Sequence, residues 1–549
     1  MVQPLRKKSE LVLRALRRAD YARAEEIARK AVASSPATAE NWSVLGVALF
    51  ALRRPAEALD ALGQALVRDP FDLSAVVAVS HIARHAGMAE ETLPFLKLVS
   101  HQHANKVVAT LALVDALLSL DRVEEASVEM ALISRLAPDN PDVALLRGRI
   151  AHAEWRLDGA EALFRQVIEL RPEDAKAHYH LAWTRADAGR WIPALAAADR
   201  ALTWAPDRAT SAATRFLVAT ILLAMGELQE GWTAYAARLD PDLPGAPVIA
   251  VDAPRWDGAS SLRGRNLLVM GEQGLGDEIA FLGLLGDLSE AVGPTGRLSL
   301  CIDPRLHPLV ARQWPDLRLL GHETRRIDGR PHRAPVDAPP AELFTLQGDL
   351  LRLFRAAPAD FAGVGGYLAP CPERMRTWRG WLDQLPPGPK VGLTWRSGKM
   401  VDSRSRNFAP VAEWAPVTGT GGVQFINLQY GSTAEELAEL QSVAASPVTT
   451  PPDLDLFHDL EGLAALAATL DLTIGFSNAT TNLIGALGCP LWLITPPGAW
   501  TALGTAHYPW YPQARRFGAQ YPDPWSQVMQ SVGRDLTGWL GASERRQGL

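Results

Sequence analysis

The sequence predicts two structural classes in one chain: an N-terminal all-α repeat array and a C-terminal α/β region with two parallel-sheet lobes. Three observations support this prediction. A motif recurs at a period near ~34 residues through residues 1–238. Prolines and glycines then cluster over 239–262, where the helical periodicity ends. Beyond this linker, strand-like apolar runs alternate with helical segments.

Composition agrees with a multidomain protein. At 549 residues the chain is too long for a single core. Charged residues make up 21%, hydrophobic residues 48%, and the formal net charge is −6, which argues against broad disorder and against a nucleic-acid surface. Cys301, Cys371 and Cys489 are far apart and follow no disulfide or zinc pattern. With no predicted membrane span or secretion signal, we expect a cytoplasmic protein.

The first 238 residues contain about seven copies of a helical-hairpin motif. The clearest copy carries small and apolar residues at fixed offsets and ends in a proline: Trp42, Leu45, Gly46, Leu49, Ala58, Leu62, Ala65 and Pro70. Small residues let two antiparallel helices approach closely, and the proline stops the second helix. These units resemble the tetratricopeptide family, which implies a superhelix whose concave face binds a protein. A scaffold or dimerisation arm is the alternative.

Strands and helices alternate after the linker. The first predicted lobe covers 263–370 and contains the strands NLLVM, RLSLCI and DLRLL, followed by a charged, proline-rich stretch at 322–340 that we expect to be a long surface loop. The second lobe covers 386–541, with the strands KVGLTW, VQFINL, DLTIGF and PLWLIT and a closing amphipathic helix. Such alternation predicts parallel sheets covered on both faces.

Two α/β lobes in series predict the GT-B architecture of glycosyltransferases. The segments EGWTAYAARL, PRWDGASSLRGRNLLVMGEQGLGDEIAFL, VGLTWRSG and DLTIGFSNATTNLIGALGCPLWLI resemble bacterial proteins that join tetratricopeptide repeats to a heptosyltransferase-like GT-B domain. The segment GAWTALGTAHYPWYP resembles the subgroup that glycosylates flagellin. That resemblance implies a cytidine monophosphate-linked nonulosonic acid donor, of the pseudaminic or legionaminic type, and no further cofactor.

The glycine turn GEQGLGDE follows the first strand of the first lobe. Its spacing matches neither the dinucleotide fingerprint nor the P-loop. Asp277 matches the proposed general base of the heptosyltransferases, and a carboxylate there could take the proton of an acceptor hydroxyl. Helix capping is its alternative role. The remaining candidate acceptor-side residues are Glu272, Gln273, Gly274, Gly276 and Glu278, with both glutamates either orienting the loop or solvated.

The second lobe carries the candidate donor site. Basic and hydroxyl residues follow the strand KVGLTW and could neutralise a nucleotide phosphate, unless they form only a solvated loop. A second group surrounds a helix start that favours an anion, although ordinary N-capping explains the same residues. Ser477 and Asn482 stand where related enzymes carry an acid and a histidine, so a histidine mechanism is in doubt. The donor-binding candidates are Arg396, Ser397, Lys399, Gln429, Ser477, Asn478, Thr480, Thr481 and Asn482.

Two further expectations concern the pocket wall and metals. Trp500, Tyr508 and Trp510 could line the sugar or nucleotide pocket, or simply pack between the lobes. No Asp-x-Asp pair occurs near the basic loop, so we predict transfer without a metal. The leading hypothesis is a protein O-glycosyltransferase that modifies Ser or Thr of flagellin. The alternatives are transfer to a lipid or polysaccharide acceptor, and a non-catalytic adaptor that binds flagellin or another partner.

Overall fold

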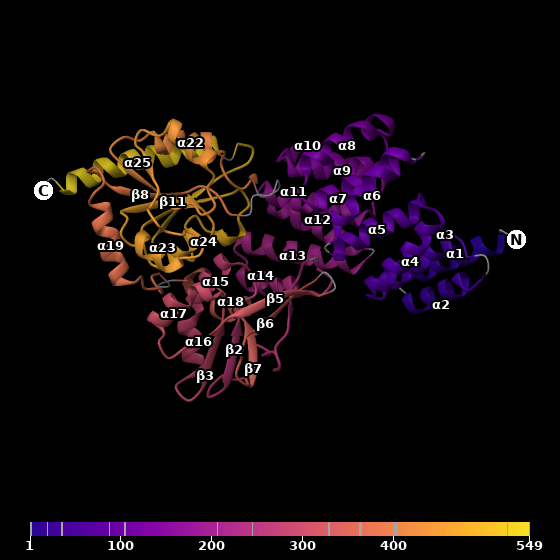
Figure 1. The fold of residues 1–549 in the computed structure, drawn as a ribbon, viewed down its shortest axis with the longest axis horizontal. Coiled ribbons are helices and arrows are strands. Elements are labelled where there is room, and N and C mark those ends of the chain that lie inside the picture. Colours follow the sequence, from indigo (N-terminus) through magenta and orange to yellow (C-terminus); the bar gives the residue numbers. More distant parts are fainter. Residues whose placement is uncertain are drawn as a thin grey trace. The chain divides into compact units, whose positions relative to one another are not determined.

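The computed structural model describes residues 3–18, 20–34, 37–86, 88–103, 106–205, 207–243, 245–327, 330–361, 365–398, 405–523 and 525–547. The chain divides into two compact units. Unit 1 comprises Met1–Leu181 with Arg326–Pro331, and unit 2 comprises Ala182–Arg325 with His332–Leu549. Figure 1 colours the chain from indigo at the N-terminus to yellow at the C-terminus.

Unit 1 is all-helical over its main segment, in agreement with the predicted repeats. Its helices form successive antiparallel pairs: α1 (Gln3–Arg17), α2 (Tyr21–Val32), α3 (Ala39–Ala51), α4 (Pro55–Arg68), α5 (Leu73–Ala86), α6 (Ala89–Gln102), α7 (Lys106–Ser119), α8 (Val123–Leu136), α9 (Pro141–Ala153), α10 (Leu157–Leu170) and the start of α11 (Ala175–Asp187). The first helices of the pairs, α1, α3, α5, α7 and α9, also contact one another in succession and form an inner layer.

Close packing within each pair depends on the small residues of the repeat. A Cβ atom added to Gly46 in α3 would lie 2.6 Å from Cγ of Leu62 in α4. The equivalent atom on Gly148 in α9 would lie 2.5 Å from Cε1 of Phe164 in α10. These glycines therefore allow the two helices of a pair to approach closely enough to bury the large side chain between them.

Unit 2 begins with helices of the repeat pattern that pack within the α/β region. These are α12 (Trp191–Trp204), α13 (Arg208–Met225), α14 (Leu228–Ala234) and the 3₁₀ helix η1 (Tyr235–Leu239). Helix α14 contacts α18 (Gln347–Phe354), and Trp232 Nε1 donates to the carbonyl of Arg355 at 2.8 Å. By length and hydropathy α13 could cross a membrane, but it packs here against α12, α14 and η1.

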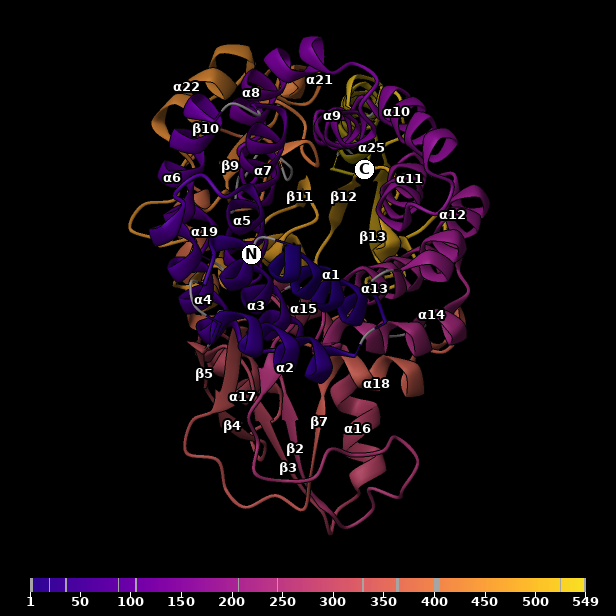
Figure 2. The same cartoon turned by 90° about the vertical axis from the view of Figure 1, so that its right-hand side faces the viewer.

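A four-stranded, fully parallel sheet follows. Its strands are β2 (Asn266–Met270), β3 (Arg297–Cys301), β4 (Arg318–Leu320) and β7 (Leu343–Leu346), in the spatial order β4-β3-β2-β7 (Figure 2). The helices that connect or follow these strands are α15 (Leu275–Phe281), α16 (Leu285–Val292), α17 (His307–Gln313) and α18, with the 3₁₀ helices η2 (Leu282–Leu284), η3 (Pro304–Leu306) and η4 (Pro358–Phe361). The strand order reverses between β2 and β7.

A second parallel sheet has six strands. They are β8 (Lys390–Thr394), β9 (Gln424–Asn427), β10 (Val448–Thr449), β11 (Leu472–Phe476), β12 (Leu491–Thr495) and β13 (Ala514–Gly518), in the order β10-β9-β8-β11-β12-β13. The accompanying helices are α19 (Pro372–Leu382), η5 (Val411–Trp414), α21 (Ala415–Thr418), α22 (Ala434–Val443), α23 (Leu460–Ala467), α24 (Ala479–Ala486), η6 (Trp500–Ala502) and α25 (Ser526–Gln547). This is a doubly wound order, and it reverses between β8 and β11.

One prediction about the first lobe was wrong. The stretch expected to be a long surface loop contains strands β5 (His322–Ile327) and β6 (Arg330–Pro335), which form a small sheet with β1 (Val248–Ile249) in the order β1-β6-β5. Residues of β5 are mostly exposed and those of β6 half-buried, so neither strand shows the apolar alternation by which strands are recognised. The linker is also ordered where it supplies β1, because Val248 and Ile249 pair with β6.

Candidate functional site

The strand orders indicate where a ligand would sit in unit 2. In open parallel sheets, ligands bind beyond the carboxyl ends of the strands at the point where the strand order reverses. In the four-stranded sheet that point is the turn after β2, which begins at Gly271, together with Gln347 after β7. In the six-stranded sheet it is Trp395 after β8 and Ser477 after β11. The candidate segments found in the sequence follow three of these four strands.

The helix starts beside these two points meet. Helix α15, which follows β2, contacts α24, which follows β11 (Figure 1). A Cβ on Gly276 would lie 2.9 Å from Nδ2 of Asn482 and 3.5 Å from Cα of Ala479, so a side chain at this position would have to displace the Asn482 amide. The Tyr511 hydroxyl donates to Oδ1 of Asn482 at 2.8 Å. We call this contact between α15 and α24, with Asp277, Tyr508 and Tyr511 beside it, the lobe junction.

Asp277 lies half-buried in the first turn of α15. Its Oδ2 accepts a hydrogen bond from the backbone N–H of Gly274 at 3.2 Å, so the capping role foreseen for this residue is confirmed. The pKa of both Tyr508 and Tyr511 is raised, mainly by burial. The negative charge of Asp277 is a further cause of the increase. The Asp277 charge is therefore felt at the lobe junction, while its role as a base stays a prediction.

Glu272 is buried in an ion-pair network, which excludes the alternative of a solvated charge. Its Oε1 lies 2.8 Å from Nη2 of Arg238 and also accepts from the N–H of Gly348 at 2.8 Å. The Arg238 side chain is only 6% exposed and also reaches Asp349 at 2.9 Å. Burial alone would lower the pKa of Arg238, but Glu272 and Asp349 raise it above its usual value. This network anchors the turn after β2 to η1 and to the start of α18.

Glu278 is also buried and paired, so it is not a solvated end charge either. It accepts from the N–H of Asp303 at 2.8 Å and from Nε2 of His322 at 3.1 Å, and it lies 3.4 Å from Nη1 of Arg333. Arg333 Nη1 also donates to the carbonyls of Gly271 at 3.0 Å and Gln273 at 3.3 Å. The side chain of Gln273 donates to the hydroxyl of Tyr235. Strands β5 and β6 therefore hold the glycine turn.

In the second lobe, Arg396 and Gln429 are occupied in building the turn after β8. Arg396 is buried, pairs with Glu436 at 2.6 Å and donates to the carbonyl of Gly431 at 2.7 Å. Oε1 of Gln429 accepts from the N–H groups of Trp395 and Arg396 at 2.8 and 2.9 Å. These contacts contradict the picture of a solvated basic loop at Arg396, and they leave its donor-binding role a prediction.

Of the two other predicted residues of this loop, the structure describes Ser397 but not Lys399. Ser397 is half-buried at the end of the turn, next to the exposed Gly398. Lys399 lies outside the described residues.

The helix start after β11 shows the N-capping foreseen as an alternative. Asn478 accepts from the N–H of Thr481 at 3.0 Å, while its Nδ2 donates to Oγ1 of Thr394 at 2.9 Å and to the carbonyl of Arg396 at 3.1 Å. Asn478 therefore caps α24 and joins β11 to the turn after β8. Thr480 is buried beside it, whereas Ser477 and Asn482 are half-buried.

The aromatic candidates pack inside unit 2. Trp510 is 6% exposed, its Nε1 donates to the carbonyl of Thr501 at 2.9 Å, and its ring lies 5.2 Å from that of Phe361 and 6.3 Å from that of Trp232. Trp500 also packs on Trp232, at 6.2 Å between centroids. Tyr508 is likewise buried. The packing alternative is therefore observed, and a pocket-wall role for these residues stays a prediction.

The sequence reasoning missed Arg516, on the unpredicted strand β13. Its Nε donates to Oγ1 of Thr495 at 3.0 Å and its Nη1 to the carbonyl of Thr505 at 3.0 Å. Burial lowers the pKa of Arg516. Within the described part of the chain no carboxylate pairs with this half-buried cation. A guanidinium in such a setting is suited to receive an anion.

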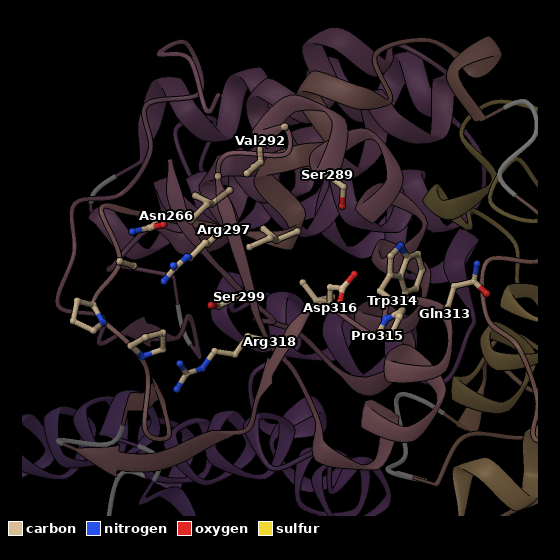
Figure 3. Close-up of a pocket in the computed structure, with 18 residues that line it drawn as sticks. Asn266, Ser289, Val292, Arg297, Ser299, Gln313, Trp314, Pro315, Asp316 and Arg318 are labelled. Carbon is tan, nitrogen blue, oxygen red and sulfur yellow. The ribbon is translucent and has the colours of Figure 1, made fainter. Parts of the chain in front are cut away.

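A pocket of about 590 Å³ lies elsewhere in the first lobe (Figure 3). Asn266, Arg297 and Arg318, which line it, begin strands β2, β3 and β4. The pocket is therefore at the amino-terminal edge of the sheet, opposite the edge that carries Asp277. Among the described residues, no three His, Cys, Asp or Glu side chains are grouped so that they could hold a metal ion.

Comparison with known proteins identifies the family. The chain is 35% identical over 533 residues to protein FlbA of Caulobacter vibrioides, covering 95% of this chain and 88% of the relative. The chain belongs to the FlbA family. Tetratricopeptide repeat models match residues 10–72, 83–150 and 156–213, which confirms the predicted repeats.

Solved structures of tetratricopeptide proteins are also similar to parts of this chain. A thermophilic protein from Thermus thermophilus is 25% identical over 34% of this chain and all of that one, with a TM-score of 0.31. A repeat protein from Parabacteroides merdae is 17% identical over 43% of this chain and 91% of that one, with a TM-score of 0.34.

Proposed function

We propose that this FlbA-family chain is a GT-B glycosyltransferase that works without a metal, with the repeats binding a protein acceptor. The proposed reaction moves a nonulosonic acid from a cytidine monophosphate donor to a Ser or Thr hydroxyl of flagellin. The acceptor oxygen forms a bond to the anomeric carbon, the bond from that carbon to the phosphate oxygen breaks, and the hydroxyl proton passes to a carboxylate. Cytidine monophosphate leaves with the bonding electron pair.

The observation that carries the proposal is the lobe junction. In each of the two parallel sheets, a helix begins beside the point where the strand order reverses: α15 after β2 and α24 after β11. The starts of these two helices are in contact at Gly276 and Asn482. A donor at one reversal point and an acceptor at the other would therefore be adjacent. Asp277 is the proposed base, because it is the half-buried carboxylate at that point, whereas Glu272 and Glu278 are held in buried ion pairs.

Arg516 supports the donor side of the proposal. Its side chain reaches the hydroxyl of Thr495, the last residue of β12, and a leaving phosphate gains from a preorganised guanidinium there. Tyr508 connects this cation to the junction, since its pKa responds to Ser477, Asp277 and Arg516. Flagellin as acceptor rests on the resemblance of the segment GAWTALGTAHYPWYP and on the flagellar association that FlbA membership suggests.

The test replaces Asp277 with Asn in the full chain, co-expressed with flagellin and a nonulosonic-acid pathway. Asn keeps a side-chain oxygen for the N–H of Gly274 but cannot take a proton, so we expect intact-mass analysis to show unmodified flagellin. Loss of a general base costs on the order of 10²- to 10⁴-fold in rate. Full modification by the Asp277→Asn chain would refute the assignment of the base.

A non-catalytic adaptor is the second candidate. It is favoured by the occupation of Arg396, Gln429 and Asn478 in hydrogen bonds that stabilise the lobe itself. Hydrolysis of the donor by the purified chain, measured as release of cytidine monophosphate, would exclude the adaptor. No hydrolysis and no transfer, combined with retained flagellin binding, would establish it.

A further inference from the structure

Unit 1 has an apolar pocket on its inner layer of helices. The pocket has a volume of about 430 Å³ and lies between α3, α5 and α7. The side chains that line it are mostly apolar: Val47, Phe50, Leu73, Ser74, Val77, Ala78, His81, Ile82 and Val108. Val77 remains 42% exposed although it lies on the inner layer. The pocket can therefore accept an apolar side chain from another molecule.

The same inner layer becomes cationic immediately beyond the pocket. Arg84 follows His81 by one turn of α5, and its Nη1 lies 3.1 Å from Oδ2 of Asp115 on α7. Arg149 on α9 binds the other oxygen of that carboxylate. One carboxylate thus lies between two guanidinium groups. Asp115 is the only acidic residue of α7, and α5 has none.

The pKa values of Asp115 and His180 indicate an excess of positive charge around Arg84 and Arg149. Burial alone would raise the pKa of Asp115, but Arg149, Arg84 and Lys176 bring it well below its usual range. Burial lowers the pKa of His180, and Arg149, His152 and Lys176 lower it further against the opposite effect of Asp115. The surplus of positive charge favours a negatively charged partner.

We propose that this surface, from the apolar pocket to Arg149, binds an extended peptide segment of the partner protein through one apolar side chain and acidic side chains nearby. The proposal rests on the partner-binding role given above to the repeats. One turn of helix separates His81 from Arg84, about 5 Å, and an extended peptide advances about 3.3 Å per residue. The first acidic residue should therefore lie roughly two residues from the apolar anchor, with the second following it toward Arg149.

The test measures fluorescence anisotropy of a fluorescein-labelled synthetic peptide on the full chain. The peptide has about ten residues, with one Leu and two Glu at the spacing derived above. Matched peptides carry Ser in place of Leu, or Gln in place of both Glu. We expect saturable binding of the first peptide, and binding at least about tenfold weaker for each of the other two.

Variants of the chain localise the site. Val77→Glu and Val77→Ser should weaken the Leu/Glu peptide about tenfold or more, whereas Val128→Glu on α8, where the valine is 74% exposed, should not. Arg84→Gln leaves Asp115 paired with Arg149 and should weaken only peptides that contain Glu. Arg23→Gln, in the exposed pair with Glu26 on α2, is its control.

The outcomes separate this inference from the proposed function. Absence of saturable binding, equal binding of the three peptides, or equal effects of Val77→Glu and Val128→Glu would overturn the inference. If flagellin is still modified in those cases, the proposed glycosyltransferase stands and only this surface is refuted. If the peptide binds as expected but neither donor hydrolysis nor modification of flagellin occurs, the surface stands and the transferase is refuted.

Discussion

Replacement of Arg238 by Met tests whether the glycine turn depends on the buried ion-pair network. Four charged groups, Arg238, Arg255, Glu272 and Asp349, sum to zero net charge in this network. Removing Arg238 leaves Glu272, whose side chain is 1% exposed, with the N–H of Gly348 as its remaining described partner. The substitution therefore leaves a buried charge without compensation.

The structure gives the expected size of the effect. At 2.8 Å the attraction in a medium of effective dielectric near 20 is about 6 kcal/mol, part of which desolvation offsets. Breaking such a buried pair from one side costs about 3 to 5 kcal/mol.

Hydrogen–deuterium exchange followed by mass spectrometry measures the effect locally. A loss of about 3 to 5 kcal/mol corresponds to exchange roughly 10²- to 4 × 10³-fold faster at the amides of the glycine turn and of Gly348. The double variant Arg238→Met/Glu272→Gln restores zero net charge and should recover most of the protection.

The control for this experiment is Arg265→Met. Arg265 and Glu342 are also 2.8 Å apart but are 55% and 42% exposed, so water already screens them and little change is expected. Equal exchange in Arg238→Met and Arg265→Met, or a double variant no better protected than Arg238→Met, would refute the anchoring role of Arg238.

Three further predictions follow from the lobe junction, the donor side and the repeats. Gly276→Ala should reduce transfer at least about tenfold because its Cβ meets Nδ2 of Asn482, and unaffected transfer would contradict the close approach. Arg516→Met should weaken calorimetric binding of cytidine monophosphate about tenfold or more, with Arg516→Lys intermediate, and unchanged affinity would remove Arg516 from the donor site. The pKa of Asp115 is lower in the folded chain than its unfolded value of about 4. The ionised carboxylate therefore contributes its full stability above the unfolded pKa, and this contribution is lost as pH falls through the folded pKa. Thermal melting followed by circular dichroism should show an acid-sensitive step that the Asp115→Asn variant lacks.

Much of the fold was predictable because it depends on local patterns. The period of the repeats, the apolar strands and the glycine turn each lie within a short stretch of sequence, and their helices and strands are observed where expected. Strands β5 and β6 were not predicted, because charged residues on exposed strands produce no apolar alternation. Strand β13, which carries Arg516, was also missed.

The candidate site was predictable in position but not in chemistry. Asp277 could be placed at the end of a strand, since that placement follows from the order of strand, turn and helix. The partners of the other charged residues could not be inferred. Arg238 and Glu272 are 34 positions apart, Arg396 and Glu436 are 40, and Glu278 and Arg333 are 55. No local pattern connects residues at such separations.

The sequence by itself determined an all-α repeat array, two parallel-sheet lobes and the strand ends at which acidic, basic and hydroxyl residues gather. These features follow from periodicity and chain order, which are properties of neighbouring residues. Only the tertiary structure decided which of those residues are engaged in buried ion pairs and hydrogen bonds that stabilise the fold, and which lie at the lobe junction. The reason is physical: a buried charge must find a partner, and the partner is supplied by whichever distant segment the fold brings within hydrogen-bond reach.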